Sequence, residues 1–171
     1  GRIYALERSP TSCELLRKKY SDNQKVKILE QDLLSDSLPR VDDALWMWTC
    51  FCEFQPKDQK RAIEMLDKSV RRSLFVDIPV ITSRSNVTFT DGRYGELKAS
   101  WANLQVYFPE DSDVREYAKD TDFALKYSAF YKTDTERDRM MYVLSKENLQ
   151  LNEAHDKLVS QRPVVIIEHY N

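Results

Sequence analysis

Short apolar runs alternate with helical spacing over the first part of the chain. Ile3–Leu6 predicts a buried strand that ends at Glu7, and apolar residues at helical intervals predict a helix from about Pro10 to Tyr20. Ser9 and Pro10 suit the start of that helix, as N-cap and first helical residue. A second strand, Val26–Leu29, then leads into Glu30-Gln31-Asp32.

The same alternation continues as far as Pro79. Ala44–Thr49 is apolar along its whole length, which predicts a central strand buried on both faces. Lys57–Val70 has the spacing of an amphipathic helix, and Ser73–Ile78 predicts a fourth strand. The order βαββαβ favours an α/β fold with a mostly parallel sheet flanked by helices.

The pattern changes after Pro79. Alternating residues around the Asp91-Gly92 turn predict a hairpin insertion or cap over about residues 80–108, and a C-terminal extension covers 147–171. We expect a single domain over 1–171. The remaining predicted elements are a helix from Pro109, an antiparallel strand pair (Ala124–Tyr131 and Arg139–Leu144), a helix over about Glu147–Val159, and a strand, Val164–Glu168, that joins the sheet or a neighbouring chain.

The overall charge is nearly balanced. The chain has 26 basic and 28 acidic residues and a formal charge of −2, so we expect no capture of nucleic acid and no binding to a membrane surface. The longest apolar run, Ala44–Phe54, is interrupted by polar residues and falls short of the ~20 residues that span a bilayer. Membrane insertion is not expected.

Three cysteines, Cys13, Cys50 and Cys52, occur at spacings that fit neither a disulfide framework nor a zinc site. This usage is typical of a reducing compartment, so a cytoplasmic location is expected. Cys50 and Cys52 share a strand face, but no histidine or further cysteine lies near them in sequence, and we predict no metal site. His155 and His169 lie in the tail, where a surface or interface role is expected.

Acidic residues follow the predicted parallel strands. Glu7, Asp32 and Asp77 lie at strand ends, together with Trp48-Thr49-Cys50, and ligands of open parallel sheets bind outside the carboxyl ends of the strands. Glu7 suits either a ribose ligand or a cap for the following helix. Asp32 suits either a ligand contact or the cap of a short helix through Ser35, and Asp77 is expected to be structural.

In this order the strand ends resemble those of the class I, Rossmann-fold S-adenosylmethionine-dependent methyltransferases, starting at their second strand and covering about residues 2–146. The resemblance rests on "RIYALERSP", "VKILEQDLL", "DDALWMWTCFCEF" and the strands that follow. It implies S-adenosylmethionine as cofactor, with Glu7 on the ribose and Asp32 on the adenine amino group. It also implies that Gln31 and Leu33 flank the ring, and that Trp48 and Thr49 face the transferred methyl group.

The same resemblance implies methyl transfer to a small-molecule or unidentified acceptor, by direct displacement and without a covalent enzyme intermediate. No catalytic residue is assigned. Trp48, Tyr107 and Phe108 are the candidates for contact with the acceptor; for Trp48, a core position is the alternative.

The family's first strand and glycine-rich loop have no counterpart here, since none of the three glycines lies in a phosphate-cradling cluster. We expect that a segment before Gly1 is missing. The alternative is a non-catalytic methyltransferase-like module for binding or dimerisation, possible as a homodimer through the tail strand. A dinucleotide-dependent oxidoreductase, whose strand-end acid also holds a ribose, is the third reading.

Overall fold

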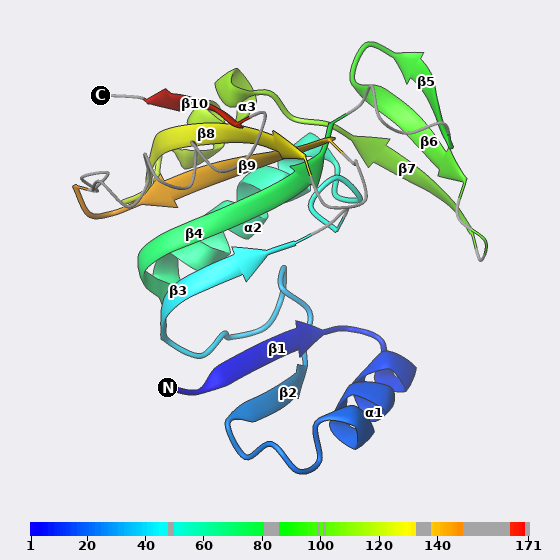
Figure 1. Cartoon of the computed structure of the whole chain (residues 1–171), viewed down its shortest axis with the longest axis vertical. Helices are drawn as coiled ribbons and strands as arrows, with labels where there is room; N and C mark the ends of the chain where they lie inside the picture. The colour runs from blue at the N-terminus through cyan, green and yellow to red at the C-terminus, as the bar shows by residue number, and fades with distance from the viewer. Residues whose placement is uncertain are drawn as a thin grey trace. The chain divides into compact units, whose positions relative to one another are not determined.

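The computed structural model describes residues 1–47, 50–80, 86–98, 100, 102–132, 138–148 and, as backbone only, 165–169. Contacts between Cα atoms divide the chain into two compact units, Gly1–Pro39 and Arg40–Asn171. Each unit has its own sheet or sheets, which Figure 1 labels by element. The two units are described separately below.

The first unit is a β-α-β arrangement, as the sequence predicts, but its first strand is not buried as expected, since Ile3 is 60% and Leu6 38% exposed. Strand β1 (Ile3–Glu7) and strand β2 (Val26–Glu30) pair in parallel, with Ile3 opposite Val26 and Glu7 opposite Glu30. Helix α1 (Pro10–Lys19) connects them. It begins where Ser9 Oγ accepts the backbone N–H of Ser12, and basic residues fill its last turn, where they complement the helix dipole.

The second unit contains a five-stranded sheet in the order β10-β8-β9-β4-β3 (Figure 1). Only β3 and β4 pair in parallel, and helix α2 (Pro56–Ser69) connects them. The pairs β4–β9, β9–β8 and β8–β10 are antiparallel. The strands are β3 (Val41–Trp46), β4 (Val70–Pro79), β8 (Ala124–Lys132), β9 (Asp138–Ser145) and β10 (Val165–His169).

This arrangement corrects one part of the predicted fold class. The α/β class and the antiparallel pair β8–β9 are confirmed, but the sheet is mixed rather than mostly parallel. The apolar runs of β4 and β9 do not reveal strand direction, because a strand buried on both faces has a continuous apolar pattern whichever way its neighbour runs.

Strand β3 differs from the central strand expected over Ala44–Thr49. It is the last strand of the five-stranded sheet, and the side chain of Leu45 is 58% exposed. On its exposed side Asp43 forms an ion pair with Arg72 of β4. Thr49 and the neighbouring Trp48 lie outside the described residues. The prediction of burial on both faces is therefore wrong for the described strand.

The predicted hairpin insertion forms a three-stranded antiparallel sheet of β5 (Val87–Asp91), β6 (Tyr94–Lys98) and β7 (Asn103–Tyr107). Gly92, in the β5–β6 turn, has φ of +50°, which glycine adopts without steric cost. The strand register places Val87 opposite Leu97 and Leu97 opposite Leu104 on one face. This inner face packs on the core, where Leu97 is 5% exposed.

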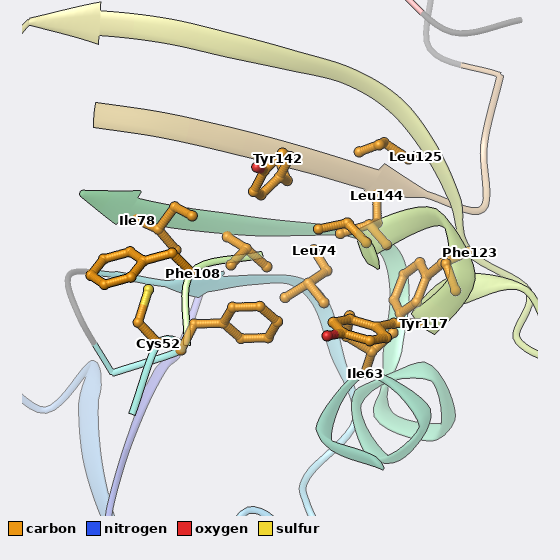
Figure 2. Packing of buried hydrophobic residues seen from close by; sticks show 14 of the residues in the cluster. Cys52, Ile63, Leu74, Ile78, Phe108, Tyr117, Phe123, Leu125, Tyr142 and Leu144 are labelled. Atoms are coloured by element: carbon orange, nitrogen blue, oxygen red, sulfur yellow. The ribbon is translucent and has the colours of Figure 1, made fainter. Parts of the chain in front are cut away.

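The core of the second unit lies between its sheets and the helices α2 and α3 (Asp111–Ala118). Figure 2 shows Ile63 of α2 and Tyr117 of α3 beneath Leu74 of β4 and Leu144 of β9. Apolar burial of this kind contributes roughly 25 cal/mol per Å² and is the main stabilising contribution to the unit.

The tail strand joins the chain's own sheet. β10 pairs with β8, with Val165 opposite Tyr131 and His169 opposite Tyr127. The helix predicted over about 147–159 falls almost wholly outside the described residues, and Glu147 and Asn148 are not helical. In the described part of the chain, no helix combines the length and apolar character needed to span a bilayer.

We expect Gly95→Ala to destabilise the insertion sheet. A Cβ at this position would lie 2.9 Å from Val87 Cγ1 and 3.1 Å from the Thr88 carbonyl oxygen, so the strand would have to shift. Overpacking of this kind costs about 1–3 kcal/mol, which urea unfolding followed by circular dichroism would measure. Glu96→Ala, on the opposite face of the same strand, is the control. Equal stability of the two variants would contradict the close packing.

Candidate functional site

The carboxyl ends of β1 and β2 bring three of the predicted residues together. The N–H of Gln31 donates to the carbonyl oxygen of Glu7 at 3.1 Å, which extends the parallel ladder one step beyond Glu30. Asp32 is the next residue. Glu7, Gln31 and Asp32 therefore lie at one end of a single strand pair, as the sequence predicts.

One carboxylate oxygen of Glu7 stabilises the turn between β1 and α1. Oε1 accepts the backbone N–H of Ser9 at 2.7 Å, at the start of α1. The Glu7 backbone carbonyl also accepts the thiol of Cys13 at 3.3 Å, from the first turns of the same helix. Among the described residues, Oε2 of Glu7 has no hydrogen-bond or ion-pair partner. The capping role is thus filled by one oxygen, and the second stays available.

Asp32 is held in the same way. Its Oδ1 accepts the N–H of Leu34 at 2.9 Å, and its carbonyl oxygen accepts the N–H groups of Ser35 and Asp36 at 3.2 and 2.9 Å. Its own N–H donates to Asp36 Oδ2. In the described part of the chain Oδ2 of Asp32 has no partner. The segment through Ser35 is a turn and not the short helix expected, but Asp32 caps it and keeps a second oxygen for a ligand.

Gln31 contributes an unsatisfied buried acceptor. Its Nε2 donates to the carbonyl oxygen of Ser37 at 3.2 Å, while its Oε1 is buried without a partner. A buried acceptor without a hydrogen bond costs about 1–3 kcal/mol. A ligand that donates a hydrogen bond to Oε1 would offset this cost. Leu33, the fourth cofactor candidate of this segment, is partly buried.

Asp77, near the carboxyl end of β4, has a structural role, although with a different partner from the turn amide expected. Its carboxylate binds Arg139 of β9 through Nε at 3.1 Å and Nη2 at 2.7 Å, and it accepts the hydroxyl of Tyr131 at 2.9 Å. Asp77 is 5% exposed and Arg139 4%. Breaking a buried pair of this kind leaves an uncompensated charge, so it fixes β4 against β9.

The two described acceptor candidates, Tyr107 and Phe108, are both buried, at 5% and 2% exposure. The N–H of Tyr107 donates to the carbonyl oxygen of Cys52 at 2.8 Å, which ties the end of β7 to the loop that follows β3. Trp48 and Thr49, the other candidates near this loop, lie outside the described residues.

Gln59 is a residue that the sequence reasoning missed. It lies in the first part of α2 with no exposed surface, and its Nε2 donates to the carbonyl oxygens of Phe51 at 3.0 Å and Tyr107 at 3.1 Å. Its amide therefore joins the loop after β3 to the end of β7. A single glutamine in an amphipathic helix gives no sequence signal for such a role, because both partners are backbone atoms.

The Tyr107 side chain lies in a cluster with Arg93, Asp113 and Tyr94. Arg93 lies over its ring, 5.3 Å from the centroid, and pairs with Asp113 of α3. The ring of Tyr94 lies 4.7 Å away. Burial, followed by the nearby Asp113 carboxylate, raises the pKa of the Tyr107 phenol to about 12. The phenol is therefore neutral and does not act as a base near neutral pH.

The cysteines show no metal-site geometry where the structure describes them. Cys13 and Cys52 are buried and Cys50 is exposed, and none of the three is in a disulfide. Among the described residues, no group of three or more His, Cys, Asp or Glu side chains could hold a metal ion.

Comparison with known proteins gives a likeness in fold. No family model matches the sequence, and no curated protein matches it. Among solved structures, magnesium protoporphyrin IX methyltransferase from Synechocystis, with bound S-adenosylmethionine, is similar over 86% of this chain and 60% of its own, at 13% identity and a TM-score of 0.58.

Two further methyltransferase structures are also similar in fold to this chain. A S-adenosylmethionine-dependent methyltransferase from Clostridium acetobutylicum matches 86% of this chain and 76% of its own, at 10% identity and a TM-score of 0.63. The 1,6-didemethyltoxoflavin-N1-methyltransferase of Burkholderia thailandensis matches 86% of this chain and 62% of its own, at 15% identity and a TM-score of 0.56.

These matches show the fold: the chain has the architecture of class I S-adenosylmethionine-dependent methyltransferases. It spans about 60% of the length of the Synechocystis enzyme. At identities of 10–15% the likeness carries the arrangement of elements, and function has to be argued from the site.

We expect the stability of the fold to fall as the pH rises from about 10 to about 12. The phenol of Tyr107 has its pKa raised from 10 to about 12 by burial, so an unfolded chain releases this proton first. The contribution, on the order of 2 kcal/mol, is fully present below pH 10 and is lost as the pH rises through the folded-state pKa.

Thermal unfolding by circular dichroism across this range would measure the loss. Burial also raises the pKa values of Tyr117 and Tyr142, so Tyr107→Phe should make the pH dependence shallower without removing it. Tyr94→Phe, at a more exposed tyrosine, is the control. An unchanged slope in Tyr107→Phe would contradict the assignment.

Proposed function

We propose that this chain forms the greater part of a S-adenosylmethionine-dependent methyltransferase that acts on a small molecule. The observation that carries the proposal is the pair of carboxylates at the carboxyl ends of β1 and β2. Glu7 and Asp32 each use one oxygen to fix a turn and keep the other without a partner among the described residues. The methyltransferase fold around them supports the same reading.

The polar atoms of this end suit an adenosine group. Oε2 of Glu7 can accept hydrogen bonds from ribose hydroxyls, as strand-end acids do in nucleotide-binding folds. Oδ2 of Asp32 is an acceptor for the adenine amino group, and Gln31 flanks the ring. Leu33 supplies an apolar side chain to the ring, and Trp48 and Thr49 face the methyl group in this proposal.

The chemistry asked of the protein is modest. S-adenosylmethionine supplies an electrophilic methyl group, and this chain would hold it and the acceptor close and in line. No covalent intermediate on the protein is required, and no residue is assigned as catalytic. The Synechocystis enzyme was solved with bound S-adenosylmethionine, and the Burkholderia enzyme with 1,6-didemethyltoxoflavin and S-adenosylhomocysteine, which supports a small-molecule acceptor. Of the proposed acceptor residues Trp48, Tyr107 and Phe108, the two that the structure describes, Tyr107 and Phe108, are buried, so we propose that they shape the acceptor side from the core without touching the acceptor.

The proposal takes residues 1–171 as one methyltransferase-like domain, because the structural matches extend over 86% of the chain. The three cysteines, none of them in a disulfide, support a reducing, cytoplasmic compartment. The competing non-catalytic, dimeric module rested in part on a tail strand in need of a partner. β10 pairs with β8 of the same chain, which weakens that argument.

We expect Glu7→Gln to weaken S-adenosylmethionine binding by about tenfold or more, measured by isothermal titration calorimetry. Gln keeps a carbonyl oxygen for the Ser9 N–H but replaces the free carboxylate oxygen by an amide NH₂, which cannot accept from a ribose hydroxyl. A hydrogen bond to a charged group contributes about 1.5–3 kcal/mol, which corresponds to this loss.

Glu30→Gln is the matched control, because it removes the same charge from the residue opposite Glu7 in the strand pair. Binding should be unchanged in this control. Equal affinity of wild-type protein and Glu7→Gln would contradict the ribose assignment. Binding of S-adenosylmethionine without transfer to any offered acceptor would favour the non-catalytic module.

A further inference from the structure

Phe89 is an exposed aromatic residue on the inner face of the insertion sheet, where Leu97 and Val106 are buried and Val87 and Leu104 are partly buried. The register of β5, β6 and β7 places Phe89, Gly95 and Val106 in one row on the inner face. Val106 is 1% exposed, whereas Phe89 is 38% exposed. The inner face of the sheet is therefore buried at Val106 and exposed to solvent at Phe89.

The ring of Phe89 is held from behind. A Cβ at Gly95 would lie 3.5 Å from Phe89 Cδ1, so the ring packs across the strand position that has no side chain. Its centroid is 6.0 Å from that of Phe108, at an interplanar angle of 55°. Phe89 is thus the exposed end of a packed aromatic pair.

This pair lies at the carboxyl ends of β3 and β4. Figure 2 shows Phe108 in the core cluster with Ile78, near the end of β4, and Cys52, in the loop that follows β3. The hydrogen bond from the Tyr107 N–H to the Cys52 carbonyl holds β7 at the same place. Ligands of open α/β sheets bind at this end of the strands.

The described core residues that surround Phe108 are apolar. An exposed flat ring backed by a second ring favours a planar aromatic ligand, because aromatic rings gain about 0.5–1.5 kcal/mol from offset or tilted contacts beyond their buried area.

From this arrangement we propose that the methyl acceptor is a flat aromatic molecule that contacts the exposed face of Phe89. That this ligand is the methyl acceptor rests on the proposed methyltransferase function. The preference of Phe89 for a planar ring is a separate property that can be measured without any transfer reaction.

The test compares two ligands of equal skeleton and different flatness, 2-naphthol and its saturated counterpart 2-decalol. Dissociation constants are measured by calorimetry with the full chain at saturating S-adenosylhomocysteine. We expect wild-type protein to bind 2-naphthol about fivefold more tightly than 2-decalol. Phe89→Leu, which keeps apolar volume and loses the ring, should abolish this preference, and Phe89→Tyr should retain it.

Tyr94→Leu is the matched control. Tyr94 is 40% exposed, close to the value for Phe89, but it lies on the opposite face of the same sheet, opposite Tyr107. The preference should persist in this variant. A wild-type protein without the preference, or a Phe89→Leu variant that keeps it, would overturn the proposal. If Phe89→Leu fails to fold, nuclear Overhauser contacts between 2-naphthol and the Phe89 ring in wild-type protein decide the question, and their absence overturns it.

The two proposals fail in different ways. Loss of the naphthol preference with intact S-adenosylmethionine binding would remove the acceptor class and leave the methyltransferase proposal standing. A naphthol preference that persists in a protein unable to bind S-adenosylmethionine or S-adenosylhomocysteine, measured then without either, would keep the aromatic site and remove the methyltransferase.

Discussion

Parallel strand pairing is the constraint on which both units depend. Two parallel neighbours cannot be joined by a tight turn, so the chain has to cross over the sheet between them. It does so twice, through α1 between β1 and β2 and through α2 between β3 and β4. Each crossover brings two strand ends together, and the polar candidates of the first unit and the aromatic pair of the second lie at such ends.

Glu7 and Asp32 each use one carboxylate oxygen in local structure, and the other oxygen has no partner among the described residues. A backbone N–H bound to one oxygen orients the carboxylate. Ser9 does this for Glu7, and Leu34 does it for Asp32. For each acid the sequence left two interpretations open, helix cap or ligand; capping of the local backbone and binding of a ligand do not exclude each other. One oxygen satisfies the fold, and the other can serve a ligand without rearrangement of the turn.

Local sequence patterns predicted well where helices and strands form, but they predicted less well which strands pair with each other. The helices α1 and α2 begin within one residue of the predicted positions, because Pro and N-cap signals are local. The exposure of Leu45 could not be predicted, since an apolar strand has the same pattern at the edge of a sheet as at its centre. The mixed sheet escaped prediction for a related reason: pairing partners lie far apart in sequence, as Asp77 and Arg139 do.

The residues that the sequence could not reveal are those that act through backbone or through tertiary packing. Phe89 resembles any strand aromatic until the register shows that Gly95 lies opposite it. Gln59 resembles any helix residue until its amide is found between the carbonyls of Phe51 and Tyr107. The insertion sheet cannot move away from that loop without breaking the hydrogen bond from Gln59 to the Tyr107 carbonyl and the bond from the Tyr107 N–H to Cys52. Such bonds are costly to leave unmade in the interior, so the position of Phe108, the residue after Tyr107, is fixed by the fold.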